Sequence, residues 1–167
     1  SISVVFAADY VLSMPLGVSI ASGLIYLASD TQLDIHVLSF GISSRNREKI
    51  ASQFQQKNDR LHWHEIAGDN SKLLQSLFTA SNRPYPPAAY ARLLIGRLLE
   101  NVDRAIYLDT DVIVTTDLGP LWETPFEGAC LLAVRDLPDS NAHLPRLRET
   151  VSSDDVAKYR LGQNNVY

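Results

Sequence analysis

The sequence predicts an α/β domain with a mostly parallel central sheet flanked by helices, and three observations support this fold class. An apolar run at residues 2–8 opens the chain, an alternating run follows at 33–40, and a β-branched run lies at 104–114. Segments with helical spacing of apolar residues separate these runs, and strands that alternate with helices favour a parallel sheet. The 167 residues, 46% of them hydrophobic, suit one domain with a substantial core. We therefore expect a single domain over residues 1–167.

The first two strands and the helix between them are typical of a β-α-β unit. The first strand ends at Asp9, an acid at the point where the chain leaves the sheet. Pro15 suits a first helical turn, and the apolar spacing after it predicts a buried helix that ends near Ala28. Gly41 closes the second strand. Such a unit predicts a parallel strand pair with a right-handed crossover.

The next helix and strand carry the first candidate ligands. Ser43 is a suitable N-cap for a helix at 45–56, and alternation predicts a third strand at 61–66. On that strand His62 and His64 share one face. Two histidines on one strand face can bind a metal, but a polar, exposed sheet edge is the favoured interpretation because no Cys or acidic cluster accompanies them. We leave them unassigned.

A proline-rich loop precedes a helix that we expect at residues 88–100, opened by Pro87. Arg92 lies in the early turns of this helix, where the helix dipole does not favour a cation. Two interpretations stay open: an anionic ligand, or a surface ion pair with a nearby acid. The expected core face of the helix consists of Ala91, Leu94, Ile95, Leu98 and Leu99.

The run at 104–114 delivers two carboxylates, Asp109 and Asp111, at the end of a buried strand, and a second short strand is expected at 112–114. In extended chain, residues two apart point to the same side, so both carboxylates can converge on one cation. Oxygen ligands suit Mg²⁺ or Mn²⁺ with a phosphate-bearing substrate. The alternative is a solvated acidic turn, but acids after a buried strand lie where open α/β sheets bind ligands.

The remaining elements are predicted from shorter patterns. A turn and short helix are expected at 117–122, and a buried strand at 128–136. Cys130 lies within that strand, which predicts a packed core thiol rather than a catalytic one. A loop over the site is expected at 137–149, followed by a helix that Ser152 or Ser153 caps and that continues through Tyr159.

Composition excludes several classes of protein. The net charge is −4 with acids and bases interspersed, so nothing indicates binding to nucleic acid. No apolar stretch is long enough to span a bilayer and no signal peptide is evident, so we expect a cytoplasmic protein. The glycine-rich phosphate loops of dinucleotide-binding and Walker proteins are missing, so a metal ion would have to hold any phosphates. The first and last residues suggest a piece of a longer chain.

Six motifs in unbroken order from Val4 to about Tyr167 resemble those of family 8 glycosyltransferases. This resemblance is more specific than the Asp-x-Asp tripeptide alone. The motifs are Val5-Phe6-Ala7-Ala8-Asp9, Leu16-Gly17-Val18-Ser19-Ile20, Ile35-His36-Val37-Leu38, Ala89-Tyr90-Ala91-Arg92-Leu93, Ala105-Ile106-Tyr107-Leu108-Asp109-Thr110-Asp111-Val112 and Asp117-Leu118-x-Pro120-Leu121-Trp122.

The resemblance implies a GT-A fold and retaining transfer of a hexose from UDP-galactose or UDP-glucose to a saccharide acceptor, such as the lipopolysaccharide core, with Mn²⁺ or Mg²⁺ as cofactor. By the same resemblance, Asp109 and Asp111 would bind the metal. Arg92 would be catalytic, stabilising charge on the departing UDP. The other implied donor-site residues are Ala7, Ala8, Asp9, Tyr90 and Thr110.

The sequence departs from the family pattern in two places. Family members continue after Asp9 with an acid, Asn and Tyr, whereas here Tyr10, Val11 and Leu12 follow, which affects the expected uracil contacts. The family's third metal ligand, a His, and its acceptor-side residues would lie beyond Tyr167, as would any region that makes peripheral membrane contact. We therefore expect the N-terminal part of a longer transferase.

Two alternative functions remain at this point. A non-catalytic module that binds UDP or a sugar is compatible with the altered segment after Asp9 and with the missing C-terminal part. A haloacid-dehalogenase-type phosphatase would use the strand followed by Asp109-Thr110-Asp111-Val112 as its nucleophile motif. The phosphatase is disfavoured because its nucleophile strand usually comes first in the chain.

Overall fold

The computed structural model describes residues 1–54, 59–80, 86–134 and 154. The chain divides into two compact units, Ser1–Thr124 and Pro125–Tyr167. The first unit holds the sheet and all the helices and strands described below. It stays a prediction that residues 1–167 form one donor-binding domain.

A four-stranded sheet forms the centre of the first unit. Its order is β3-β2-β1-β4, and each neighbouring pair is parallel. This arrangement confirms the α/β class that the alternating pattern predicted. The strands are β1 (Ile2–Asp9), β2 (Leu33–Phe40), β3 (Arg60–Glu65) and β4 (Ile106–Tyr107).

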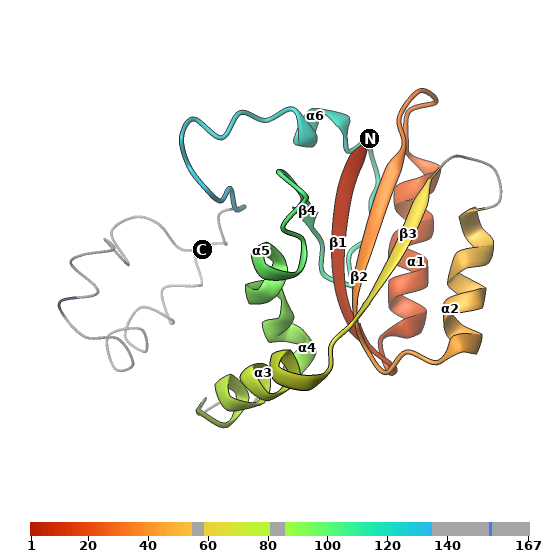
Figure 1. Ribbon diagram of the computed structural model, residues 1–167. Coiled ribbons are helices and arrows are strands. Elements are labelled where there is room, and N and C mark those ends of the chain that lie inside the picture. The colour runs from red at the N-terminus through yellow and green to blue at the C-terminus, as the bar shows by residue number, and fades with distance from the viewer. Residues whose placement is uncertain (55–58, 81–85, 135–153, 155–167) are drawn as a thin grey trace, which may run out of the picture. The chain divides into compact units, whose positions relative to one another are not determined.

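The helices lie on both faces of this sheet, with α1 and α2 on one side and α3 to α5 on the other (Figure 1). The predicted N-cap of α2 is confirmed, because the Ser43 side chain accepts a hydrogen bond from the Asn46 backbone N–H at 3.3 Å. The helical segments are α1 (Ser13–Ile25), α2 (Ser44–Ala51), a 3₁₀ turn (Ser52–Phe54), α3 (Gly68–Ala80), α4 (Pro87–Tyr90), a second 3₁₀ segment (Ala91–Leu94), α5 (Ile95–Leu98) and α6 (Gly119–Trp122).

The strand period of two separates two apolar clusters. We call the face packed by α1 and α2 the α1 face, and the opposite face the α3 face. Along β1, Val4 and Phe6 belong to the α1 face, whereas Val5 and Ala7 belong to the α3 face. Leu16 and Ile20 of α1 complete the first cluster. The second cluster is completed by Leu74, Ala91, Leu94 and Leu99.

A buried serine joins α1 to the segment after the predicted metal ligands. The Val114 backbone N–H donates to Ser22 Oγ at 2.9 Å, and Ser22 Oγ donates to the Ser19 carbonyl at 2.7 Å. Val114 itself is buried in the α1-face cluster. The link satisfies a backbone donor that would otherwise be buried without a partner.

The prediction of one continuous helix over residues 88–100 is wrong. Two short α-helical turns, α4 and α5, flank the 3₁₀ segment instead. In a 3₁₀ helix, residues three apart lie directly above one another. Ala91 and Leu94 have this spacing and are both buried, so the tighter turn places them together against the sheet.

Two predicted strands are also wrong. Residues 112–114 form no strand, because the ladder along β4 ends at Tyr107. Residues 128–134 of the predicted strand are exposed, and Cys130 is an exposed free thiol rather than a core residue. An apolar run becomes a strand only where another strand accepts its backbone hydrogen bonds, and none of the four described strands pairs with residues 128–134. The loop predicted at 137–149 lies outside the described residues, as does nearly all of the helix through Tyr159.

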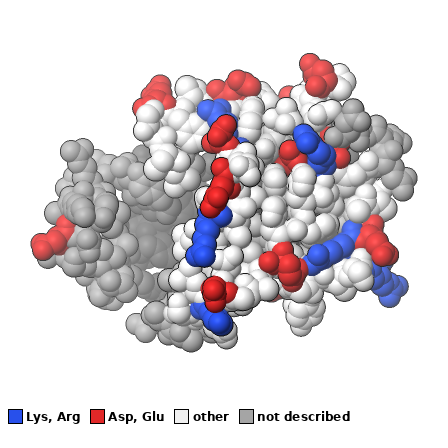
Figure 2. Space-filling view, viewed as in Figure 1, with Lys and Arg blue, Asp and Glu red and all other residues white. Residues whose placement is uncertain are grey.

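The surface shows acids and bases interleaved, without a large patch of one sign on the face seen in Figure 2. In the part of the chain that the structure describes, no helix is both long and apolar enough to cross a bilayer.

Candidate functional site

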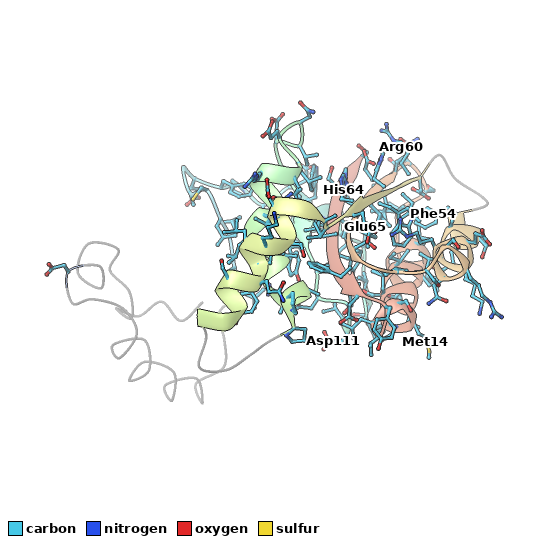
Figure 3. The ribbon with its side chains drawn as sticks, turned by 60° about the horizontal axis from the view of Figure 1, so that its bottom comes forward. Met14, Phe54, Arg60, His64, Glu65 and Asp111 are labelled. Atoms are coloured by element: carbon cyan, nitrogen blue, oxygen red, sulfur yellow. The ribbon has the colours of Figure 1, made fainter. Side chains whose placement is uncertain are left out.

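The candidate site lies at the carboxyl ends of β1 and β4, which are neighbours in the sheet. Because the two strands are parallel, the residues that follow them emerge at the same edge. Pairing continues one residue beyond β4, where the Leu108 N–H donates to the Val5 carbonyl at 3.0 Å. Asp111 and Met14, near the start of α1, lie at the same end of the molecule in Figure 3. The topology therefore brings the acids after β1 and β4 to one end of the sheet.

Asp109 is the centre of a three-residue cluster. Its Oδ1 accepts hydrogen bonds from Arg92 Nη2 at 2.8 Å and from the Tyr107 hydroxyl at 3.1 Å. The Arg92 guanidinium also lies over the Tyr107 ring, 4.7 Å from its centroid, and Arg92 Nε donates to the Ala89 carbonyl at 2.9 Å. These contacts fix the guanidinium in orientation. They also join the 3₁₀ segment to the end of β4.

Tyr107 remains a hydrogen-bond donor over the whole physiological pH range. Burial of the phenol raises the pKa of Tyr107 to about 12, and the Asp109 carboxylate adds to this rise while Arg92 opposes it. A neutral phenol beside a carboxylate donates to it and does not compete with it for a cation.

The segment after Asp109 is a turn rather than the extended chain that we assumed for the two carboxylates. The Val112 N–H donates to the Asp109 carbonyl at 3.3 Å, and Thr110 is buried while Asp111 is exposed. The prediction that Asp109 and Asp111 lie on one side of an extended strand was therefore wrong, because β4 ends at Tyr107, before the first acid. A turn of this kind can still present two carboxylates to one side, since it reverses the chain within a few residues.

Asp9 stabilises the connection from β1 to α1. Its Oδ1 accepts from the backbone N–H groups of Val11 at 2.9 Å and Leu12 at 3.1 Å. Short Asp side chains commonly cap turns in this way. A ligand-binding role for Asp9 stays a prediction, and this oxygen would have to serve the turn as well as the ligand.

The other residues predicted for the donor site are more deeply placed. Ala7 is buried in the α3-face cluster, and Ala8 is buried on the α1 face. Tyr90 is half-buried and packs against the α3-face cluster. Ala7 and Tyr90 therefore lie on the same face as Tyr107, whereas only the backbone of Ala8 can face a ligand on that side.

The residues at the end of β4 suit a hard divalent cation. The hydrogen bonds that the described residues make to the Asp109 carboxylate are both on Oδ1, and half of its side-chain surface is exposed. Asp109 Oδ2 and the exposed Asp111 carboxylate are the oxygen ligands that Mg²⁺ and Mn²⁺ prefer. Arg92 donates a hydrogen bond to the Asp109 carboxylate, so its guanidinium would add a second positive charge, beside that of the cation, for an anionic ligand.

Sequence reasoning missed Tyr107. Its signal was present, because Tyr107 lies two residues before Asp109 at the end of an apolar run. Arg92 was predicted either to bind an anionic ligand or to form a surface ion pair. It forms an ion pair, and its partner Asp109 is itself a predicted metal ligand, so both interpretations place Arg92 at the candidate site.

The family pattern described as Glycosyl transferase family 8 matches residues 1–162. The chain belongs to glycosyltransferase family 8. This confirms the resemblance carried by the six motifs.

Among curated proteins, the chain is similar to Glycosyltransferase GlyF from Streptococcus pneumoniae serotype 4 (strain ATCC BAA-334 / TIGR4), with 27% identity over 158 residues, which are 95% of this chain and 37% of that protein. A putative glycosyltransferase from Haemophilus influenzae (strain ATCC 51907 / DSM 11121 / KW20 / Rd) is 26% identical over 139 residues, 81% of this chain and 39% of that protein. The chain thus spans less than half the length of these two relatives.

A solved structure of the same fold is that of the galactosyltransferase LgtC in complex with donor and acceptor sugar analogs. It has a TM-score of 0.64 and 31% sequence identity, and the match covers 75% of this family 8 chain and 43% of that chain. The parallel sheet flanked by helices is therefore an architecture that this chain shares with the solved structure of LgtC.

Proposed function

We propose that the chain is the donor-binding part of a retaining glycosyltransferase that moves a hexose from a UDP-sugar, UDP-galactose or UDP-glucose, to a saccharide acceptor such as the lipopolysaccharide core. The observation that carries the proposal is the cluster of Arg92, Tyr107 and Asp109 at the end of β4, with the exposed Asp111 beside it. Family membership and the likeness to LgtC, whose structure holds donor and acceptor sugar analogs, support it.

Asp109 and Asp111 are the proposed ligands of Mn²⁺ or Mg²⁺. When bound, the cation would neutralise part of the diphosphate charge of the donor. The hydrogen bond from Tyr107 holds Asp109 Oδ1 in place and so leaves Oδ2 for the cation.

Arg92 is the proposed catalytic residue. Its guanidinium is held by the Ala89 carbonyl and by the Tyr107 ring, so it can donate to an anionic group with little loss of side-chain freedom. Departure of UDP concentrates negative charge on a phosphate oxygen, and a fixed cation stabilises that charge more in the transition state than in the bound donor. This role requires that Arg92 share its donors between Asp109 and the diphosphate.

The experiment is a calorimetric titration of UDP into the 167-residue chain with Mn²⁺ and with EDTA. We expect UDP to bind only in the presence of Mn²⁺. We expect Asp111→Asn to abolish this metal-dependent binding. Asp103→Asn is the matched control, because Asp103 is an exposed acid that precedes β4 and so lies at the other end of that strand from Asp111. Equal binding of UDP in EDTA and in Mn²⁺ would contradict the proposal.

Arg92 is tested in the same titration by Arg92→Ala against Arg97→Ala, an exposed arginine of α5. We expect only the first substitution to weaken metal-dependent binding of UDP. Identical affinities for the two variants would rule out a diphosphate contact by Arg92. If UDP binds but full-length enzyme transfers no hexose to any saccharide acceptor, a non-catalytic UDP-binding module is the better description.

A further inference from the structure

A second cluster of metal-ligating side chains lies on β2 and β3, apart from the end of β4. Asp34 and His36 are two residues apart on β2, and His62 and His64 are two residues apart on β3. His36 pairs with His62 in the sheet register. All four side chains therefore lie on the α3 face, and we call them the histidine cluster.

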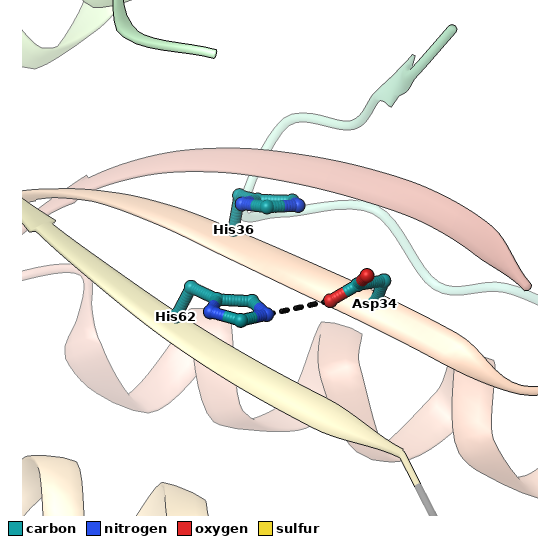
Figure 4. Close-up of side chains that lie close together, drawn as sticks. All are labelled: Asp34, His36 and His62. Carbon is teal, nitrogen blue, oxygen red and sulfur yellow. Dashed lines mark hydrogen bonds and ion pairs between the residues drawn. The ribbon is translucent and has the colours of Figure 1, made fainter. Parts of the chain in front are cut away.

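Three members of the histidine cluster offer ligand atoms to one point. One ligand atom from each of Asp34, His36 and His62 lies within 4.8 Å of the other two. His62 Nε2 is 2.6 Å from Asp34 Oδ1, and the rings of His36 and His62 are stacked with centroids 4.8 Å apart. Figure 4 shows the two rings side by side on their strands, with the Asp34 carboxylate next to them.

His36 supplies an independent sign of a ligand. Only 7% of the residue is exposed, and its Nε2 is buried with no hydrogen-bond partner among the residues that the structure describes. Its other nitrogen, Nδ1, is 3.0 Å from His64 Nε2. In the tautomer with the proton on Nδ1, His36 donates to His64 and directs an unshared electron pair from Nε2. Buried polar atoms without a hydrogen-bond partner are rare in folded proteins. A histidine that binds a metal through one ring nitrogen typically donates a hydrogen bond from the other, as His36 Nδ1 does in this tautomer.

We propose that Asp34, His36 and His62 bind a divalent transition-metal ion of the zinc class, at a site separate from the acids after β4. Two imidazoles and one carboxylate are the ligand set of open zinc sites, with water in the remaining position. Imidazole ligands favour zinc, cobalt, nickel or copper over the magnesium and manganese that suit Asp109 and Asp111. His64 orients His36 and is a positioning residue rather than a ligand.

Binding of an ion requires the ligand atoms to move closer together. In a tetrahedral site with ligands about 2.1 Å from the zinc ion, two ligand atoms lie about 3.4 Å apart. The widest separation, 4.8 Å, must therefore close by more than about 1 Å. His62 and Asp34 can make this movement, because 42% and 18% of their side chains are exposed. The ion would take the place of the proton that His62 and Asp34 share.

The site is distinct in position from the candidate donor site. His36 and Tyr107 both pair with Val5, from opposite sides of β1, so their backbones are two strand spacings or about 10 Å apart. Asp109 and Asp111 lie further along, after β4 has ended. One ion cannot bridge the two groups of ligands.

The test is a titration of Co²⁺ into the metal-free 167-residue chain, followed by visible absorption. We expect one equivalent to produce the d–d bands of a nitrogen- and oxygen-ligated ion, and Zn²⁺ to remove them by displacement. His62→Ala and Asp34→Asn should abolish the bands, with folding of each variant checked by circular dichroism. Asp69→Asn, an exposed acid of α3, and Asp111→Asn are the controls that should keep them.

His64→Ala leaves the three ligands in place and should weaken Co²⁺ binding by about 10- to 100-fold through loss of the His36 contact. As a measurement that needs no substitution, imidazole ¹⁵N NMR of the wild-type chain should show Zn²⁺ shifting the ring nitrogens of two histidines. The proposal is overturned if the wild-type chain gives no bands, if the bands survive in both ligand variants, or if Asp111→Asn alone removes them.

Discussion

The two faces of the sheet differ in what they bury, although the same strands form both. On the α1 face, residues from β1, β2, α1 and α2 make one continuous apolar cluster. On the α3 face, the apolar cluster around Val5 and Leu38 gives way to the histidine cluster toward the β3 edge. Parallel sheets usually have both faces covered by apolar side chains. The α1 face is thus apolar throughout, while the α3 face combines an apolar cluster with the polar groups of both proposed sites.

Two members of the histidine cluster, His36 and His64, have lowered pKa values. Burial lowers the pKa of His36, and the neighbouring His62 lowers it further. Burial and His62 likewise lower the pKa of His64. The two groups are therefore mostly uncharged near neutral pH, which avoids repulsion between the stacked rings.

The largest expected difference between the faces is in the free energy of unfolding. Phe6→Ala on the α1 face should lower it by about 3–5 kcal/mol, because the side chain is fully buried and leaves a large cavity. His62→Ala on the α3 face should lower it by less than about 1 kcal/mol in EDTA, because its pair with Asp34 is partly solvated. Urea denaturation of both variants measures the difference. Similar losses would show that the histidine cluster is part of the structural core.

A smaller effect separates two serines of α1 that both lie toward the α1 face. Ser22→Ala should lower the free energy of unfolding by about 1–3 kcal/mol, because the Val114 N–H loses its acceptor. Ser19→Ala is the matched control. The Ser19 hydroxyl is buried and has no hydrogen-bond partner in the described part of the chain, so its removal should change stability by no more than about 0.5 kcal/mol. Equal effects would mean that the Ser22 link is replaced by water.

The smallest expected effect is a pH dependence at the end of β3. Partial burial acts to raise the pKa of Glu65, but hydrogen bonds from the Gly41 N–H, the Ser39 hydroxyl and Arg47, together with the Arg47 charge, hold it below its usual value. Stability from this carboxylate is therefore present above its usual pKa and lost as the pH falls through the lower folded value.

Glu65→Gln should cost less than about 1 kcal/mol at pH 7, since the carboxylate is largely exposed, and its effect should shrink toward zero near pH 3. Unfolding of wild type and variant across this range measures the loss. A difference that stays constant with pH would assign the effect to packing instead of charge.

Local patterns predicted the parts of the fold that local physics determines. An apolar run located β1, alternation located β2 and β3, and the side chain of Ser43 located the start of α2. The continuous helix over 88–100 was wrong because tertiary burial of Ala91 and Leu94 overrides the helical repeat. The strand predicted at 112–114, and the described part, 128–134, of the other predicted strand, were wrong because a strand depends on a partner that the local sequence does not specify.

The candidate site was predictable as a set of residue types but not as an arrangement. The acids after β4 were found from their place behind an apolar run. The pairing of Arg92 with Asp109 depends on where the 3₁₀ segment docks, which no local pattern determines. The histidine cluster was half visible: His62 and His64 were noted, but their register against Asp34 and His36 is a property of the folded sheet.

The parallel sheet also sets an order in which the molecule can be assembled during synthesis. β1, β2 and β3 can pair once residues 1–65 have left the ribosome, whereas β4 pairs with β1 from a later position, residues 106–107. Pairings between residues distant in sequence are slow to form because the chain entropy is lost before the contact is gained. β4 is also only two residues long, so it adds few contacts to hold it in place. The histidine cluster therefore belongs to the early-forming part of the protein, and the Arg92–Asp109 cluster is completed last.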